Sequence, residues 1–162
     1  KHKNVVQLLD IFTGPLSVHL VYESLEVSLH QIQATNTPDI TEIDLAIFAK
    51  EILQALEYMH CVLGIVYGQI NPRNILLSFN SCEIKLANIA ISVLQPQQKS
   101  FKADIRSVGT LLVALKEPGT IMCNPESLEL KTDDVSDLCN HFLQQIESLS
   151  LRGLLKVSFA LF

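Results

Sequence analysis

The most informative segment of this chain reads Ile65-Val66-Tyr67-Gly68-Gln69-Ile70-Asn71-Pro72-Arg73-Asn74-Ile75-Leu76-Leu77. A second, shorter segment follows at Ala87-Asn88-Ile89-Ala90. Between them, residues 83–86 alternate like a half-buried strand, and residues 79–82 supply the turn before it. The pattern predicts a β-hairpin that carries Asn74 and Asn88 toward one cleft.

Both segments resemble the catalytic loop and the metal-binding loop of the protein kinases. In that family the first reads H-R-D-x-K-P-x-N and the second reads A-D-F-G. At the positions of the His, the Arg, the catalytic Asp, the Lys and the metal-binding Asp, this chain has Tyr67, Gly68, Gln69, Asn71 and Asn88. Pro72, Asn74 and the apolar frame are kept. The resemblance therefore implies kinase loops without their charged groups.

Phosphoryl transfer requires groups that these neutral side chains do not provide. A carboxylate must accept or orient the hydroxyl proton, and at least one must hold magnesium against the phosphates. Gln69 cannot take the proton, and the amide of Asn88 is a poor ligand for a hard dication. With both positions neutral, Asn74 is expected to hydrogen-bond the loop backbone instead of a metal ion. The residues predict no catalytic group and no metal site.

Three more segments extend the resemblance in the family's order. Residues 1–12 are similar to the strand after the regulatory helix, residues 18–25 to the strand and hinge beneath adenine, and residues 101–109 to the start of the central large-lobe helix. The resemblance implies that a bound nucleotide would contact Tyr22, Glu23, Leu25 and Leu76. It also implies two structural residues. Tyr67 would fill apolar core, and Asp104 would hold the catalytic-loop backbone, so that its removal would cost about 1–3 kcal/mol.

The resemblance implies an α+β fold. Residues 26–162 would form a mainly helical, kinase-like large lobe with a small β-hairpin, and residues 1–25 would be two remnant strands of the small lobe with the hinge. The Gly-rich loop, the ATP-binding Lys strand and the Glu-bearing helix have no counterpart in the chain. There is no A-P-E motif, and residues 95–100 would connect the metal loop directly to the central helix. The family's platform for a peptide substrate is therefore expected to be missing.

Periodic apolar residues and capping signals predict the helices. Thr41 and Asp44 form an approximate capping box, and the helix that follows is expected to run for about five turns and to end between His60 and Gly64. Further helices are expected at residues 103–115, after Asp133 or Asp134, and at 151–159. The resemblance to the kinases implies one more helix over residues 26–32, after the hinge. Residues 117–131, which are rich in Pro, Gly and Asn, are expected to form a loop.

The composition limits which binding partners and which cellular compartment we expect. Apolar residues make up 48% of the chain and charged residues 18%, so an exposed apolar flank is expected, and the strands at 8–12 and 18–22 would favour self-association through unpaired edges. A net charge of −5 without a Lys/Arg cluster argues against nucleic acid. No apolar run is long enough for a membrane span. Four cysteines without metal-type or disulfide-type spacing predict reduced thiols in an intracellular protein, cytoplasmic or nuclear.

Two functions of different classes follow, and a third reading stays open. The first is a pseudokinase, an inactive kinase-like domain that binds or scaffolds a protein partner without a cofactor. The second is a residual Ser/Thr-type protein kinase that binds ATP and magnesium with an N-terminal lobe outside this chain. The third is a degenerate gene product without selected activity. A serine hydrolase is excluded because the chain has no G-x-S-x-G elbow.

Overall fold

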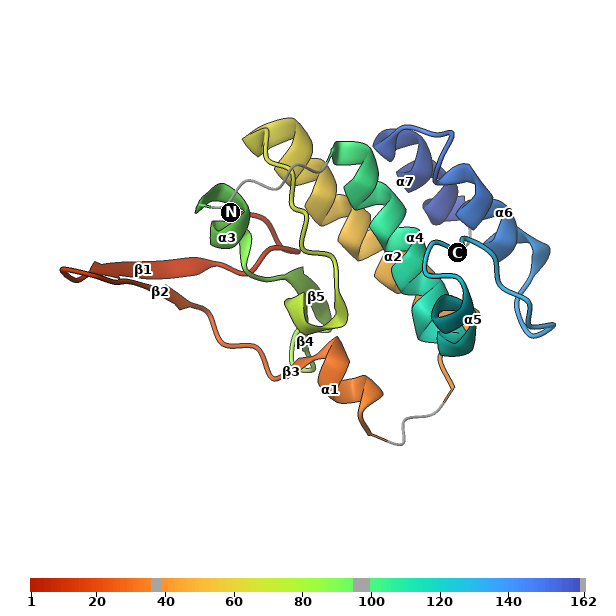
Figure 1. The fold of residues 1–162 in the computed structure, drawn as a ribbon, viewed down its shortest axis with the longest axis horizontal. Coiled ribbons are helices and arrows are strands. Elements are labelled where there is room, and N and C mark those ends of the chain that lie inside the picture. The colour runs from red at the N-terminus through yellow and green to blue at the C-terminus, as the bar shows by residue number, and fades with distance from the viewer. Residues whose placement is uncertain (36–38, 95–99, 161–162) are drawn as a thin grey trace.

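The structure, a computed structural model, describes residues 1–35, 39–94 and 100–160 (Figure 1). Its strands are β1 (Leu8–Thr13), β2 (Val18–Tyr22), β3 (Val27–Ser28), β4 (Ile75–Ser78) and β5 (Glu83–Leu86). Its helices are α1 (Leu29–Gln33), α2 (Glu42–Glu57), α3 (Ile89–Leu94), α4 (Phe101–Lys116), α5 (Pro118–Cys123), α6 (Asp137–Gln145) and α7 (Leu151–Ala160), with a π-helix η1 (Tyr58–Leu63) and a 3-10 helix η2 (Pro72–Asn74). The predicted α+β fold, mainly helical with small sheets, is confirmed.

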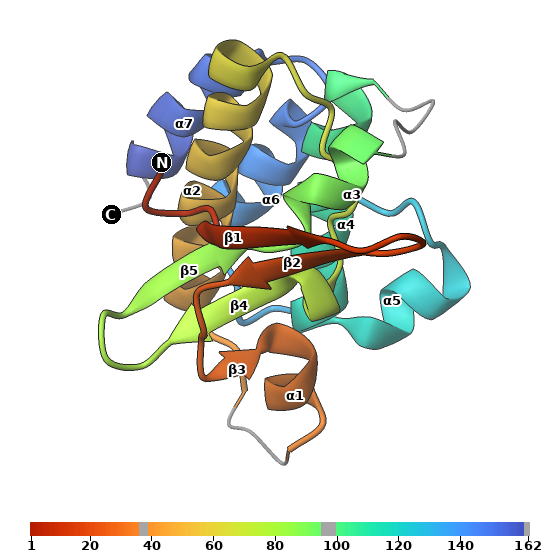
Figure 2. The same ribbon diagram turned by 90° about the vertical axis from the view of Figure 1, so that its left-hand side faces the viewer.

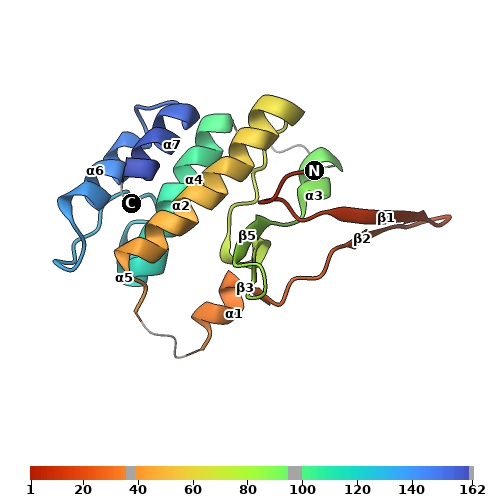
Figure 3. The same ribbon diagram turned by 180° about the vertical axis from the view of Figure 1, so that it is seen from behind.

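Helix α2 is the centre of the helical body and packs against α4 and α7 (Figure 3). The predicted capping box is present, since Thr41 Oγ1 accepts from the Asp44 N–H at 3.2 Å and the Asp44 carboxylate accepts from the Thr41 N–H at 2.9 Å. The helix continues as η1 and stops at Gly64, whose φ of 67° is a left-handed conformation that glycine adopts without strain. The predicted end of this helix is therefore confirmed.

Helix α4 begins two residues earlier than the sequence predicts. Ser100 is its N-cap, and its Oγ accepts from the Ala103 N–H at 3.2 Å. Eight of its 16 residues are buried, and Val108 and Val113 are fully buried. The expectation of a helix buried at the centre of the lobe is confirmed.

The strands form two separate antiparallel sheets. The predicted hairpin is β4 and β5, with Leu76 opposite Lys85, and β3 adds a third strand along β4. This third strand corrects the prediction of a helix over residues 26–32. Residues 27 and 28 pair with β4, and α1 starts only at Leu29, after Ser28 accepts the Gln31 N–H as its N-cap.

Two expectations for the C-terminal part are wrong. Residues 118–123 form α5 within the predicted loop, because a proline fits the first turn of a helix and the Glu117 carboxylate accepts a hydrogen bond from Thr120 Oγ1 at 2.7 Å. Helix α6 starts at Asp137 with Ser136 as its N-cap, and neither Asp133 nor Asp134 fills that role. The Asp134 carboxylate instead binds Lys116 Nζ at 2.7 Å.

Strands β1 and β2 form a hairpin that projects from the sheet side of the molecule, away from the helices (Figures 1 and 2). Every residue of β1 is exposed, which confirms the expected apolar flank. The chain before β1 is joined to the body because the Val6 N–H donates to the Leu86 carbonyl and the Leu86 N–H donates to the Asn4 carbonyl, each at 2.9 Å. Among the described residues, no helix has the length and apolar character that crossing a membrane requires.

Candidate functional site

The two asparagines at the kinase-like metal positions lie against each other. Asn88 Nδ2 donates to Asn74 Oδ1 at 2.6 Å, and the Ala87 N–H donates to the Asn74 carbonyl at 2.9 Å. Asn88 has a φ of 60°, a left-handed conformation that asparagine adopts more readily than most residues. The strands β4 and β5 position both residues, so the hairpin brings them together as the sequence predicts.

Gln69, at the position of the catalytic Asp, is joined to this pair through its backbone. Its carbonyl accepts from Asn71 Nδ2 at 2.9 Å and from Asn74 Nδ2 at 3.1 Å. Asn71 also caps η2, because its Oδ1 accepts the Arg73 N–H at 3.0 Å. The side chains of Asn71 and Asn74 therefore shape the loop itself, and Asn74 makes the backbone contact that the sequence analysis expects.

Tyr67 is fully buried beneath the loop. Its hydroxyl donates to the Ala87 carbonyl at 2.7 Å, and Ser92 Oγ donates to the Tyr67 carbonyl at 2.5 Å. Burial, with the nearby Asp104 carboxylate, raises the pKa of the Tyr67 phenol, so the hydroxyl stays protonated and keeps its donor role. The aromatic residue thus fills core and ties the catalytic-like loop to the metal-like loop.

Asp104, in the first turn of α4, binds the backbone of the same loop. It is 1% exposed, and its carboxylate accepts from the Tyr67 N–H at 2.7 Å and the Gly68 N–H at 2.6 Å. His60 Nε2 lies 2.9 Å from the same carboxylate. The backbone contacts expected of Asp104 are present, and His60 is a third partner.

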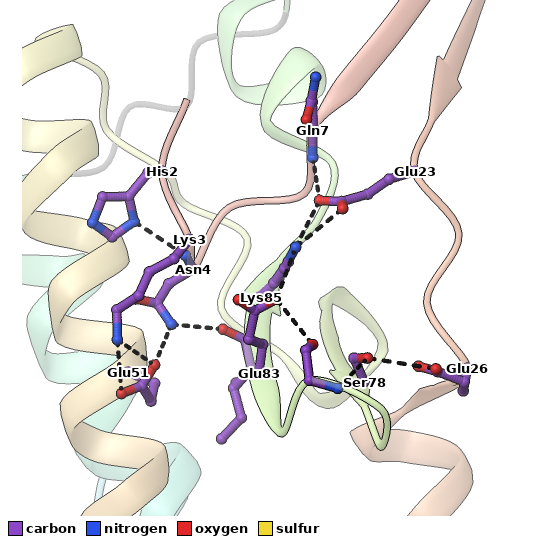
Figure 4. Close-up of polar contacts among 12 residues, drawn as sticks. His2, Lys3, Asn4, Gln7, Glu23, Glu26, Glu51, Ser78, Glu83 and Lys85 are labelled. Atoms are coloured by element: carbon purple, nitrogen blue, oxygen red, sulfur yellow. Dashed lines mark hydrogen bonds and ion pairs between the residues drawn. The ribbon is translucent and has the colours of Figure 1, made fainter.

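The hinge residues are organised around Lys85 (Figure 4). The Glu23 carboxylate accepts from the Gln7 N–H at 2.7 Å and from Lys85 Nζ at 3.0 Å. Burial opposes the ionisation of Glu23, but these two hydrogen bonds outweigh it and hold its pKa below the ordinary value. The side chain of Glu23 therefore anchors the base of the β1–β2 hairpin to β5.

The other proposed nucleotide contacts lie on β2, on β4 and between β2 and β3. Tyr22 ends β2 and lines an apolar groove of about 560 Å³ beneath the hairpin, together with Ile89 and Val93 of α3. Leu76 lies in β4 opposite Lys85, and Leu25 is half-buried between β2 and β3.

Three contributors to the site are not predicted by the sequence. His60 is expected only at a helix end, yet its partner Asp104 lies 44 residues away. Ser92 and Lys85 carry no motif signal. The alternation of residues 83–86 predicts a strand, but a strand pattern does not reveal that Lys85 pairs with the hinge.

The β4–β5 hairpin brings the two kinase-like loops together, and Asp104 at the start of α4 binds the backbone of the first loop. This arrangement defines a protein-kinase fold. A sequence profile described as the protein kinase domain matches residues 1–110. The chain belongs to the protein kinase family.

The similar proteins include mitogen-activated protein kinases of fungi. The chain is 34% identical to hog1 of Botryotinia fuckeliana and to Hog1 of Zymoseptoria tritici, and 33% identical to HOG1 of Arthrobotrys oligospora. Each alignment covers 60% of this chain and 27% of the relative. The matched region thus spans about a quarter of the length of these relatives.

Magnesium and ATP are the cofactors that the family implies, and the side chains at the metal positions do not fit magnesium. Magnesium is bound in such sites through carboxylate oxygens together with substrate phosphates. Here the cluster of Gln69, Asn71, Asn74 and Asn88 is neutral, and Asn74 Oδ1 already accepts from Asn88. No step of phosphoryl transfer follows from these side chains.

Proposed function

We propose that this chain is a pseudokinase domain, an inactive kinase-like lobe that acts by binding or scaffolding a protein partner. The observation that carries the proposal is the hydrogen bond between Asn88 and Asn74 at 2.6 Å. It joins two amides at the place where the family presents a carboxylate to the metal ion. The Asn74 oxygen is thus already hydrogen-bonded without an ion.

The chemistry of Gln69 supports the same proposal. An amide does not accept the proton of a substrate hydroxyl near neutral pH, and the loss of one member of a catalytic unit lowers the rate by about three to four powers of ten. This chain has lost the base and the metal carboxylate together. The contacts that remain, those of Tyr67 and Asp104, hold the loops in shape.

The binding surface proposed is the β1–β2 hairpin and the groove beneath it. The hairpin displays large apolar side chains, among them Leu9, Ile11 and Phe12, each more than half exposed. Exposed apolar patches of this kind mark protein interaction sites. The free cysteines support an intracellular setting, in the cytoplasm or the nucleus.

A phosphotransfer assay tests the proposal. The purified chain, with radiolabelled ATP and either magnesium or manganese, is expected to label neither itself nor a generic peptide substrate above background. The double variant Gln69→Ala, Asn88→Ala is the matched control. Labelling that this variant abolishes would overturn the proposal, whereas labelling that survives in it comes from a contaminating kinase.

The alternative is a nucleotide-binding kinase domain that needs further elements of a longer protein. It is favoured by the short span of the match, 27% of the relatives' length. Thermal melting tests whether the residues of this chain bind ATP by themselves. Binding at a Kd near ~10 μM would add about 2.7 kcal/mol at ~1 mM ATP and raise the melting temperature by several degrees. We expect no saturable shift, and a clear one would favour the alternative.

A further inference from the structure

The groove beneath the β1–β2 hairpin has two apolar walls that belong to the same chain. One wall is the inner face of the hairpin, with Ile11 and Val18, and the other includes Val93 and Leu94 of α3, which lies beside the base of the hairpin (Figure 1). All four side chains are more than half exposed. Apolar surface is stabilised by removal from water, so both walls favour an arrangement that brings them into contact.

The inner face of the hairpin carries no charge that would oppose this contact. The strand pairs Ile11–Leu20 and Thr13–Val18 share one face, because side chains alternate along each strand. Asp10 therefore lies on the outer face, and α3 has no charged residue. Closing the groove between the hairpin and α3 thus buries apolar groups without the cost of burying an unpaired charge.

The hairpin has a fixed base and a bend just above it. Glu23 joins Gln7 to Lys85 at the base (Figure 4). The register of β1 shifts between Leu8 and Asp10, which leaves one extra residue in that strand. Such a bulge interrupts the ladder and bends the strand. Beyond the bulge β1 and β2 pack mainly against each other, so this part of the hairpin can turn as a unit while its base stays in place.

We propose that the β1–β2 hairpin is a flap that closes onto α3, so that Ile11 and Val18 pack against Val93 and Leu94. The structure shows the open arrangement. Closure takes place within one chain and loses no translational freedom, in contrast to the binding of a second molecule. The inference rests on the proposed binding function and adds its regulation. A partner that binds the groove must first open the flap, and its apparent affinity falls in proportion to the open fraction.

Tryptophan quenching by acrylamide tests the closure. The chain has no tryptophan, so a single introduced one reports only its own surroundings. Val18→Trp places it on the inner face and Phe12→Trp on the outer face, where the parent side chains are 58% and 56% exposed. A hairpin that stays open predicts equal quenching of the two variants. We expect Val18→Trp to be quenched at least about threefold more slowly, the value for a flap that is closed two-thirds of the time.

Substitutions in the facing wall separate closure from shielding within an open groove. Adding Val93→Asp or Leu94→Asp to the Val18→Trp chain places a charge where the flap packs, and either one is expected to raise quenching to the level of Phe12→Trp. Leu138→Asp is the matched control, because Leu138 lies on α6 and is 59% exposed, and it is expected to leave the protection unchanged. All substituted side chains are exposed, so the fold should tolerate them.

Each other outcome counts against the proposal. Equal quenching of the two tryptophan variants, or protection of Val18→Trp that neither Asp variant in α3 removes, would overturn the flap. Protection that appears at about 50 μM but not at about 1 μM chain would also overturn it, since association with a second copy depends on concentration and closure within one chain does not. A flap that stays open leaves the pseudokinase proposal standing, because no readout here involves ATP. Phosphotransfer by a chain whose flap closes would overturn the pseudokinase proposal alone.

Discussion

Replacing Asp104 by alanine tests the contact on which the catalytic-like loop depends. The carboxylate is 1% exposed and accepts from the backbone N–H groups of Tyr67 and Gly68 at 2.7 and 2.6 Å. It also lies 2.9 Å from Nε2 of His60. Asp104→Ala therefore leaves two loop donors and a buried imidazole without their shared acceptor.

The expected loss of stability follows from these three partners. Each of the two stranded donors would cost about 1–3 kcal/mol, and the imidazole of His60 loses its hydrogen-bond partner as well. Because the three contacts share one carboxylate, the costs are not additive, and we expect a total of about 3–5 kcal/mol. For a domain of this size the melting temperature should fall by roughly 6–20 °C.

Urea denaturation and thermal melting, both followed by circular dichroism, measure this loss. Asp104→Asn keeps one acceptor oxygen and should fall between the parent and Asp104→Ala. Gln69→Ala is the matched control on the loop, and it should change stability by less than about 0.5 kcal/mol because Gln69 contacts Asn71 and Asn74 through its backbone carbonyl, which alanine keeps. The reasoning is refuted if Asp104→Ala melts with the parent or if Gln69→Ala is equally harmful.

Three further perturbations have expected outcomes. Gly109→Ala should lower the free energy of unfolding by about 1–3 kcal/mol, because its new Cβ would meet two apolar side chains at 2.5 and 2.6 Å. Gly119→Ala, whose Cβ would have no atom within 4 Å, should not lower it. Equal urea midpoints for the two variants would contradict this prediction. Lys116→Met should speed hydrogen exchange at residues 132–134, since Lys116 Nζ binds Asp134 at 2.7 Å, and unchanged exchange would argue against this tie. The lowered pKa of Glu23 contributes stability that is present above pH 4.5 and lost as the pH falls through the folded-state pKa, so Glu23→Gln should flatten the urea-midpoint profile below pH 4.5, and a parallel profile would refute the link.

Local patterns in the sequence predict much of the fold. The capping box at Thr41 and the alternation of residues 83–86 are short-range signals, and the structure has the helix and the strand in those places. The predictions are wrong where a residue distant in the sequence binds the side chain on which the local signal depends. Asp134 looks like an N-cap, but Lys116 takes its carboxylate, and α6 starts after Ser136 instead.

The sequence by itself determined which chemical groups the two kinase-like loops carry, because the identity of a side chain fixes whether it can hold a proton or a charge. Only the tertiary structure decided which groups meet. Asn88 bonds to Asn74 across 14 residues, and His60 meets Asp104 across 44. The structure also decided that the β1–β2 hairpin projects uncovered from the body. Hydrogen-bond partners and exposure depend on distances in space, and the periodicity of a sequence describes only neighbours along the chain.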